Sequence, residues 1–257
     1  MHYSVCSYSF HRSPDMDIFR YIRWNKEHGF TQLDPWMRHL EAGYDDNRYL
    51  EQVKAAAEQV GLPFGCIAVD GAHIYEPSEE LRQANRKRAY RWIDICHYLG
   101  ASQIRIDAGS REENWPDDVF AIIVEGYNDV IAYARARGVE VIVENHWGPT
   151  KHAANVVKLL EAVPGLGLLF DTMNWAPGTE EQAWSLCAKY ARLTHIKGFA
   201  FDEQGNEATY DAAKAIRLLR NSGYQGTWGI ESTPRDGDEE AGVIKTLELI
   251  KRTLQAD

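Results

Sequence analysis

The stretch VEVIVENHWG, residues 139–148, is the clearest strand signal in this chain. Its first half alternates apolar and polar side chains and is rich in β-branched residues, which is typical of a β-strand. On such a strand the valines lie on one face and Glu144 lies on the other. Glu144 ends the apolar pattern, and Asn145, His146 and Trp147 follow it. Because these side chains suit ligand binding better than a core, the stretch predicts a strand that ends at a site.

Strand-like and helix-like segments alternate along the whole chain in eight similar units. The predicted strands cover residues 3–9, 30–34, 63–70, 103–107, 139–144, 166–171, 193–197 and 227–231. The predicted helices cover residues 15–28, 46–60, 78–99, 117–137, 151–163, 179–190, 210–221 and 238–254. Parallel strands joined by helices form either an open doubly wound sheet or a closed barrel, and eight even repeats favour closure. The expected fold class is therefore α/β, a (β/α)8 TIM barrel, as a single domain over residues 1–257.

Capping residues mark the ends of several predicted helices. Ser13 and Pro14 are expected to begin the first helix, and Ser78 the third, because these residue types favour the first turn. Gly61 and Gly100 are expected to end the second and third helices, since glycine readily adopts the left-handed conformation found there.

The composition restricts the classes of function. A net charge of −10 argues against a nucleic-acid partner, because proteins that neutralise phosphates usually carry an excess of basic residues. The sequence has neither an apolar run of about eighteen residues nor an export signal at its start, so we expect no membrane partner and a cytoplasmic location. The four cysteines form no CxxC pair and are expected to be reduced and mostly buried.

Ionisable side chains recur at the ends of four successive predicted strands: Glu144, Asp171, His195 and Glu231. In a TIM barrel the carboxyl ends of all strands meet at one face, so these residues become neighbours. Three carboxylates repel one another unless a cation holds them, and three oxygen donors with one imidazole suit Mn²⁺, Mg²⁺, Co²⁺ or Zn²⁺. Any one of these residues alone is more often a helix cap, a solvated charge or a core histidine. Their recurrence favours a metal site.

The segments ENHWG, FDTMNW, THIKG and GIES are similar to the strand ends of the xylose isomerase-like TIM barrels, which include D-tagatose 3-epimerase, inosose dehydratase and an apurinic endonuclease branch. The resemblance extends over the whole chain in the order of its units. It implies that Glu144, Asp171, His195 and Glu231 bind one divalent metal ion, first of all Mn²⁺, and that Glu144 and Glu231 are the catalytic acid/base pair. The implied activity is isomerisation or epimerisation of a small ketose or related polyol through a metal-stabilised enediolate.

Two positions depart from the epimerase pattern. Epimerases of this family place a His three residues after the metal Asp and an Arg six residues after the metal His, whereas this chain has Asn174 and Phe201 there. Asn174 can still donate a hydrogen bond to a substrate, but Phe201 cannot. His146 and Lys197 are candidate replacements, as donors to the substrate or as a general acid. For Lys197, a salt bridge to a carboxylate such as Asp171 is an equal alternative.

Further candidates for substrate contact lie at or just past other strand ends: Trp36, His73, Arg105 and Trp147. Small-molecule sites commonly combine apolar walls with a few polar groups, and aromatic rings pack well on the C–H faces of sugars. Some of these tryptophans are expected near the rim by chance, because the chain has eight. For Arg105, an internal ion pair with Asp107 is the alternative.

Other functions stay open at this point. A metal-dependent lyase, of the inosose dehydratase type or the type that cleaves 3-keto sugars, would remove the same proton and then expel a leaving group. A non-catalytic sugar-binding barrel predicts no turnover of any ketose with added Mn²⁺. A DNA-repair endonuclease would require more His and acidic ligands and a basic surface. The expected partner is a small sugar or polyol, and the sequence is compatible with a homo-oligomer, either a dimer or a tetramer.

Overall fold

The computed structural model of the protein describes residues 1–256. Within this range, seven parallel strands form one curved sheet in the order β1-β7-β6-β5-β4-β3-β2. The strands are β1 (Tyr3–Val5), β2 (Cys66–Val69), β3 (Gln103–Ile106), β4 (Glu140–Glu144), β5 (Gly167–Asp171), β6 (Ala191–Gly198) and β7 (Trp228–Ser232). From β2 to β7 each strand lies beside its neighbour in sequence, and β1 pairs with β7. The sheet therefore curls back toward its own start.

The segment predicted as the second strand, residues 30–34, forms no continuous strand. It joins β1 to β2 through isolated parallel bridges, Cys6 with Asp34, Leu33 with Phe64 and Trp36 with Ala68. Pro35 interrupts the pairing because proline has no backbone N–H, although its carbonyl still accepts a 3.1 Å hydrogen bond from the Ala68 N–H. Residues 33–36 thus occupy the place of the eighth strand and close the barrel. We call them the seam.

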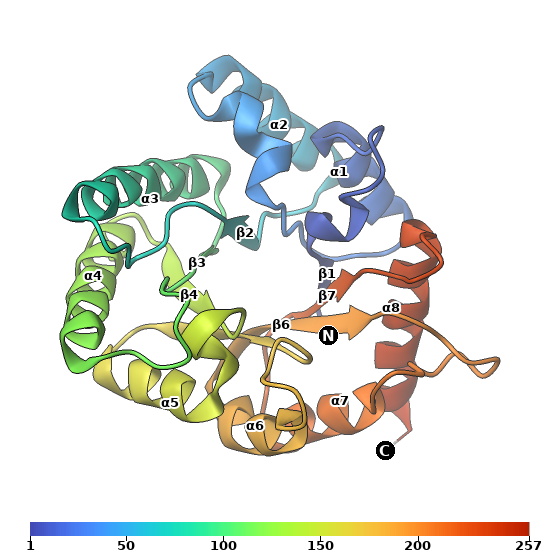
Figure 1. The fold of residues 1–257 in the computed structure, drawn as a ribbon. Coiled ribbons are helices and arrows are strands. Elements are labelled where there is room, and N and C mark those ends of the chain that lie inside the picture. The colour runs from blue at the N-terminus through green and yellow to red at the C-terminus, as the bar shows by residue number, and fades with distance from the viewer. Residues whose placement is uncertain (257) are drawn as a thin grey trace.

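Within residues 1–256, eight α-helices surround the strands and form the outer ring in Figure 1. They are α1 (Ile18–Glu27), α2 (Asn47–Val60), α3 (Glu79–Leu99), α4 (Asp117–Arg135), α5 (Ala153–Ala162), α6 (Glu180–Cys187), α7 (Ala212–Asn221) and α8 (Glu239–Gln255). Short 3-10 helices occur in the connecting segments: η1 (Ser7–Phe10), η2 (Met37–Gly43), η3 (Gly148–Lys151) and η4 (Ala188–Tyr190). The TIM barrel prediction is confirmed. Among residues 1–256, every helix is too short or too polar to cross a lipid bilayer.

The helix ends follow the capping signals with one exception. Ser78 caps α3 by accepting a hydrogen bond from the Leu81 N–H, and Gly61 and Gly100 end α2 and α3 with φ values of 71° and 77°. The predicted start of the first helix at Ser13 and Pro14 is wrong. Asp17 caps α1 instead, and the Ser13 hydroxyl donates a 2.7 Å hydrogen bond to Glu239 Oε2 on α8.

The interior of the barrel is divided into an apolar floor and a polar top. Cys66, Ile142, Leu169 and Leu193 form a small buried cluster that is separate from the large core between strands and helices. Ile142 lies on the same strand face as Glu144, which is buried at the carboxyl end of β4. All four cysteines are buried and free, as predicted. The apolar floor seals one end of the barrel, so the ionisable residues gather at the other.

Candidate active site

Four buried ionisable side chains lie at the carboxyl ends of adjacent strands. Glu144 and Asp171 are the last residues of β4 and β5, while His195 and Glu231 lie within β6 and β7. Asp171 pairs in register with His195, and Lys197 of β6 pairs with Glu231. The curvature of the barrel therefore turns the side chains toward a common centre, because residues two apart on a strand share a face.

His195 is the hub of this group. Its Nδ1 atom lies 3.1 Å from Glu144 Oε1 and also 3.1 Å from Glu231 Oε2. Glu144, Asp171 and His195 each offer a ligand atom within 4.8 Å of the others, which is close enough to share one metal ion. Glu231 belongs to a second such group with His195 and Cys6. The four predicted ligands thus lie together through His195, with Glu231 at the edge of the group.

Lys197 neutralises part of the negative charge. Its Nζ atom lies 3.0 Å from Asp171 Oδ2 and donates a short hydrogen bond to Glu231 Oε1. Lys197 is buried, so these contacts are little screened by water. The salt bridge that the sequence left open for Lys197 is present, and the ammonium group also lines the cavity above.

Arg105 is held in an ion-pair cluster on the opposite side of Glu144. Its Nη1 atom lies 2.9 Å from both Asp70 Oδ1 and Asp107 Oδ2, and its Nε atom lies 3.3 Å from Glu144 Oε2. The internal pair with Asp107 is therefore formed. Arg105 fixes the Glu144 carboxylate from one side while His195 contacts it from the other.

The contacts shift the pKa values of the carboxylates in opposite directions. Burial alone would raise the pKa of Glu231, but Lys197 and His195 outweigh it and hold that pKa well below its usual value. Burial raises the pKa of Asp171 to about 6, with Glu144 and Glu231 acting in the same direction and Lys197 opposing them. Burial would lower the pKa of His195, but the two glutamates raise it well above its ordinary value. Among these three carboxylates, Asp171 is therefore the one whose charged form its surroundings stabilise least, since the pKa values of Glu144 and Glu231 are both lowered.

The donor set fits a divalent cation. Glu144 Oε2 and Asp171 Oδ2 are buried and accept no hydrogen bond, although Arg105 Nε and Lys197 Nζ lie 3.3 and 3.0 Å away. Buried carboxylate oxygens normally have hydrogen-bond partners or bind a metal. Carboxylates and an imidazole are the donors that Mn²⁺, Mg²⁺, Co²⁺ and Zn²⁺ accept. The residues present are therefore chemically suited to hold one such ion.

A cavity of about 720 Å³ opens directly above the cluster, and we call it the central cavity. Its wall includes Glu231 and all seven residues that the sequence predicted to contact a substrate: Trp36, His73, Arg105, His146, Trp147, Asn174 and Lys197. Its volume is in the range of small-molecule sites. The cavity gives a ligand of that size access to the buried cluster.

Several of these wall residues are held by hydrogen bonds to acidic neighbours. Asp107 Oδ2 lies 3.2 Å from His146 Nδ1 and accepts a 3.3 Å hydrogen bond from Trp147 Nε1. Trp36 Nε1 donates a 2.6 Å hydrogen bond to Asp70 Oδ2. The aromatic walls of the central cavity are therefore fixed in place before any ligand arrives.

Asn174 contacts the cluster itself, since its Nδ2 atom donates a 3.3 Å hydrogen bond to Glu144 Oε1. Phe201 behaves differently. It bridges to Glu207 in the loop after β6 and does not line the central cavity. The position six residues after His195 therefore contributes no side chain to the wall of the central cavity.

Sequence reasoning missed several residues that line the central cavity, among them Cys6, Tyr8, Asp70 and Arg111. Asp70 ends the third predicted strand, so its position at a strand end could have revealed it. Cys6 and Tyr8 are two residues apart on the first predicted strand, so alternation could have placed both on its inner face. Arg111 lies in the loop between β3 and α4. No pattern in the sequence places that side chain over the cavity.

The comparisons with known proteins agree with this architecture. The family model described as "Xylose isomerase-like TIM barrel" matches residues 22–253. No curated protein is similar enough in sequence to match. Among solved structures, the probable 3-DHS dehydratase from Bacillus anthracis has a TM-score of 0.77 at 14% identity, covering 98% of this chain and 99% of that one.

Two further structures resemble the chain to a similar degree. D-psicose 3-epimerase from Clostridium cellulolyticum, solved with D-tagatose, has a TM-score of 0.71 at 15% identity and covers 100% of this chain and 96% of its own. The IOLI protein with a bound zinc atom has a TM-score of 0.79 at 13% identity, with 99% and 96% covered. At such identities the likeness concerns the fold. The family match over most of the sequence goes further: this chain belongs to the xylose isomerase-like TIM barrel family.

Proposed function

We propose that this protein is a divalent-metal-dependent sugar isomerase or epimerase that acts on a small ketose or related polyol. The observation that carries the proposal is the position of His195 Nδ1, which lies 3.1 Å from an oxygen of each of two buried glutamates below the central cavity. Two carboxylates on either side of one binding centre can act as a base and an acid on the same substrate. Membership of a family with sugar-modifying enzymes supports the same reading.

The metal would be held by Glu144, Asp171, His195 and Glu231, with Mn²⁺ as the expected ion. The zinc atom in one structural neighbour supports a divalent metal in this fold. A bound divalent ion supplies Lewis-acid polarisation of a carbonyl group. The proposed single domain over residues 1–257 provides all four ligands from consecutive strands of one barrel.

The chain's own residues would carry out the proton transfers. One of Glu144 and Glu231 removes a proton from the carbon next to the carbonyl, and the other returns a proton on the opposite face or to the neighbouring carbon. The first choice gives epimerisation and the second gives isomerisation. Lys197 and Arg105 keep these carboxylates in place through their ion pairs. Both glutamates are buried, which limits exchange of the proton with solvent water.

The walls of the central cavity would orient the sugar. Asn174 and His146 offer polar groups at the rim beside Glu144, and Trp36 and Trp147 offer aromatic surfaces. Carbohydrate-sized ligands are commonly held by such a mixture of apolar walls and a few placed polar groups.

A lyase reaction is the second candidate, and a specific observation favours it. Phe201 stands at the position where the family resemblance places the arginine that grips the ketose in the epimerases, and a dehydratase is among the structural neighbours. A lyase would use the same proton abstraction and then release water or another leaving group from the adjacent carbon. The remoter alternative is a barrel that binds sugar without turnover.

The test begins with metal analysis of the purified protein and continues with a screen of ketoses and keto-inositols in the presence of Mn²⁺. Products are identified by mass and by chromatography. A product of unchanged mass and altered configuration supports the isomerase or epimerase, whereas loss of water or of a leaving group supports the lyase. Absence of turnover with every substrate, at full metal occupancy, would refute both reactions.

A further inference from the structure

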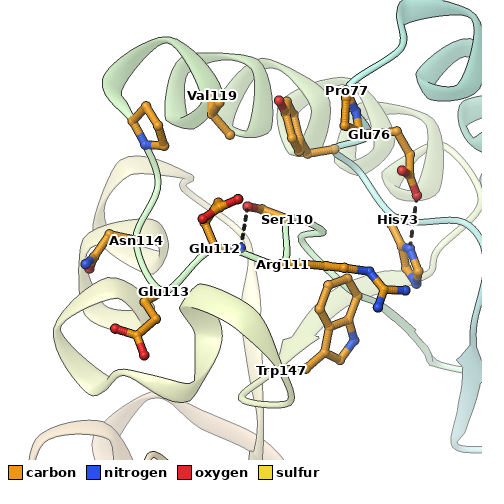
Figure 2. A pocket seen from close by; sticks show the side chains of 12 residues that line it. His73, Glu76, Pro77, Ser110, Arg111, Glu112, Glu113, Asn114, Val119 and Trp147 are labelled. Carbon is orange, nitrogen blue, oxygen red and sulfur yellow. Dashed lines mark hydrogen bonds and ion pairs between the residues drawn. The ribbon is translucent and has the colours of Figure 1, made fainter.

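A second cavity, of about 940 Å³, adjoins the central cavity, and we call it the side cavity. It lies between the loop from β2 to α3 and the loop from β3 to α4. Three residues, His73, Arg111 and Trp147, line both cavities and form the partition between them. Figure 2 shows these three side chains together at one side of the side cavity, with Glu113 and Asn114 at the other. Each cavity alone has the volume of a typical small-molecule site.

The floor of the side cavity is built from close backbone contacts. Tyr75 bridges to Gly109, and a Cβ atom at Gly109 would collide with the Tyr75 carbonyl oxygen. Gly148 approaches the Ser110 carbonyl oxygen in the same way. Three loops are thus locked together beneath the cavity, which keeps its shape fixed.

Ser110 supplies an independent sign of function. With a φ of 73°, it is the one residue other than glycine within residues 1–256 that has a positive φ. Such a conformation costs free energy for a side-chain-bearing residue and is concentrated at ligand-binding positions. Ser110 lies on the wall of the side cavity, where its Oγ atom accepts a 3.4 Å hydrogen bond from the Glu112 N–H.

The side chains that line the side cavity indicate which class of ligand it can bind. Tyr75, Val119 and Trp147 provide half-buried apolar and aromatic surface. The His73 ring lies edge-on to Trp147 at a centroid distance of 5.0 Å, which fixes the aromatic partition. Aromatic faces pack on flat rings, whether these are aromatic or the C–H faces of sugars.

The charged residues at the side cavity favour a neutral ligand over an anion. Glu76, Glu112 and Glu113 face a single cation, Arg111, so carboxylates outnumber guanidinium groups. Carboxylates accept hydrogen bonds from hydroxyl groups and repel phosphates or carboxylates.

We propose that the side cavity binds a second, neutral, hydroxylated ring of the substrate, joined to the sugar in the central cavity through the partition. The substrate class is then a glycoside whose ring in the central cavity keeps a free carbonyl group, and the second ring is either another sugar or a phenolic aglycone. This inference rests on the proposed function only for the reaction in the central cavity, since binding in the side cavity requires no turnover.

The experiment measures dissociation constants by calorimetry for matched ligands with the full chain and Mn²⁺. The series is methyl β-D-glucoside, cellobiose, phenyl β-D-glucoside and 4-carboxyphenyl β-D-glucoside, repeated with the corresponding galactosides. We expect cellobiose or phenyl β-D-glucoside to bind about tenfold more tightly than the methyl glycoside, because a packed ring adds roughly this much affinity. Higher affinity for cellobiose than for the methyl glycoside identifies a sugar as the second ring, and higher affinity for phenyl β-D-glucoside identifies an aglycone. The negative charge of 4-carboxyphenyl β-D-glucoside should abolish the gain in affinity.

Val119→Trp fills the side cavity and should remove the gain while leaving the methyl glycoside unaffected. Asn114→Trp, at the exposed rim, is a second blocking variant that does not disturb the core. Ile122→Trp is the matched control, because Ile122 lies on the same helix but faces a different surface cleft. Circular dichroism checks that each variant is folded.

Equal affinity for methyl and extended glycosides, or a gain that survives both blocking variants, would overturn the inference. Its failure differs from failure of the proposed function. Ketose turnover without higher affinity for the extended glycosides refutes only ligand binding in the side cavity. Higher affinity without any turnover refutes only the proposed reaction.

Discussion

At the scale of single residues, the candidate site is a balance of buried charges. Three carboxylates share the top of the barrel with His195, Lys197 and Arg105, and every contact between them is buried. Buried ion pairs contribute little net stability when complete, but they are costly when one partner is removed. Substitutions at the site should therefore separate into those that change chemistry and those that change stability.

Glu231→Gln should abolish turnover while preserving the fold. The amide is nearly isosteric with the carboxylate and can still contact His195, but it can neither take nor return a proton. We expect turnover to fall by a factor of about 10² to 10⁴. Steady-state kinetics on the substrate found by the screen measures this loss, and metal content and the melting temperature monitor the site and the fold.

Glu125→Gln is the matched control, because Glu125 is an exposed residue of α4 far from the site. It should behave like the unaltered protein. Activity of Glu231→Gln near that of the control would remove Glu231 from the mechanism.

Lys197→Met should destabilise the metal-free protein. The change leaves Asp171 and Glu231 without the ammonium group that lies between them, and removing one partner of a buried pair typically costs about 3–5 kcal/mol. A divalent ion should recover part of this loss, because it neutralises the same carboxylates. Thermal melts with and without Mn²⁺ measure both effects. A melting temperature equal to that of the unaltered protein without metal would contradict the ion-pair role of Lys197.

At the scale of elements, the loops at the carboxyl ends of the strands are packed against one another through their backbones. Gly148 begins η3 with a φ of 57°, and its Cα faces the carbonyl oxygen of Ser110 in the loop after β3. This contact leaves no room for a side chain. The loops around the two cavities therefore behave as one packed unit.

Gly148→Ala should destabilise the protein by about 1–3 kcal/mol, because the methyl group adds both a positive-φ penalty and a collision with Ser110. Gly178→Ala is the matched control, since Gly178 has a φ of 82° and nothing within 4 Å of an added Cβ. It should show the backbone penalty alone. Chemical denaturation of both variants measures the difference, and equal losses would mean that the loops are not in tight contact.

At the scale of the whole molecule, we expect metal binding and folding to be coupled, because the four proposed ligands come from four different strands. A ligand that binds the folded state at one hundred times its dissociation constant stabilises that state by about 2.7 kcal/mol. Removal of the metal with a chelator should therefore lower the melting temperature by about 5–10 °C and abolish turnover. Calorimetric scans before and after dialysis against EDTA, with Mn²⁺ restored as control, measure this. An unchanged melting temperature would refute binding at the cluster.

The sequence predicts the barrel well, because each unit repeats a strand that ends in polar residues and a helix with recognisable caps. Glu144 and Asp171 end strands in the structure at the positions that alternation predicts. Alternation also places Lys197 on the same inner face as His195. Their roles as ligands, acid or base stay predictions, since geometry brings the groups together without showing the reaction.

The remaining features depend on contacts that alternation does not encode. Asp17, rather than Ser13, caps the first helix because Ser13 is engaged by Glu239 more than two hundred residues away. Arg111 lies over the cavities because its loop packs on η3. Such long-range contacts are determined by the folded chain as a whole, so local pattern cannot reveal them.

The seam has a consequence for the rigidity of the cavity wall. Residues 33–36 lack a continuous ladder, but their backbone groups bond to the segments on both sides. The buried Asp34 carboxylate adds hydrogen bonds from Ser4 Oγ, Gln32 Nε2 and the Cys66 N–H. Trp36 belongs to this segment and also forms part of the cavity wall. A single buried carboxylate thus replaces the missing ladder and holds the cavity wall in place at Trp36.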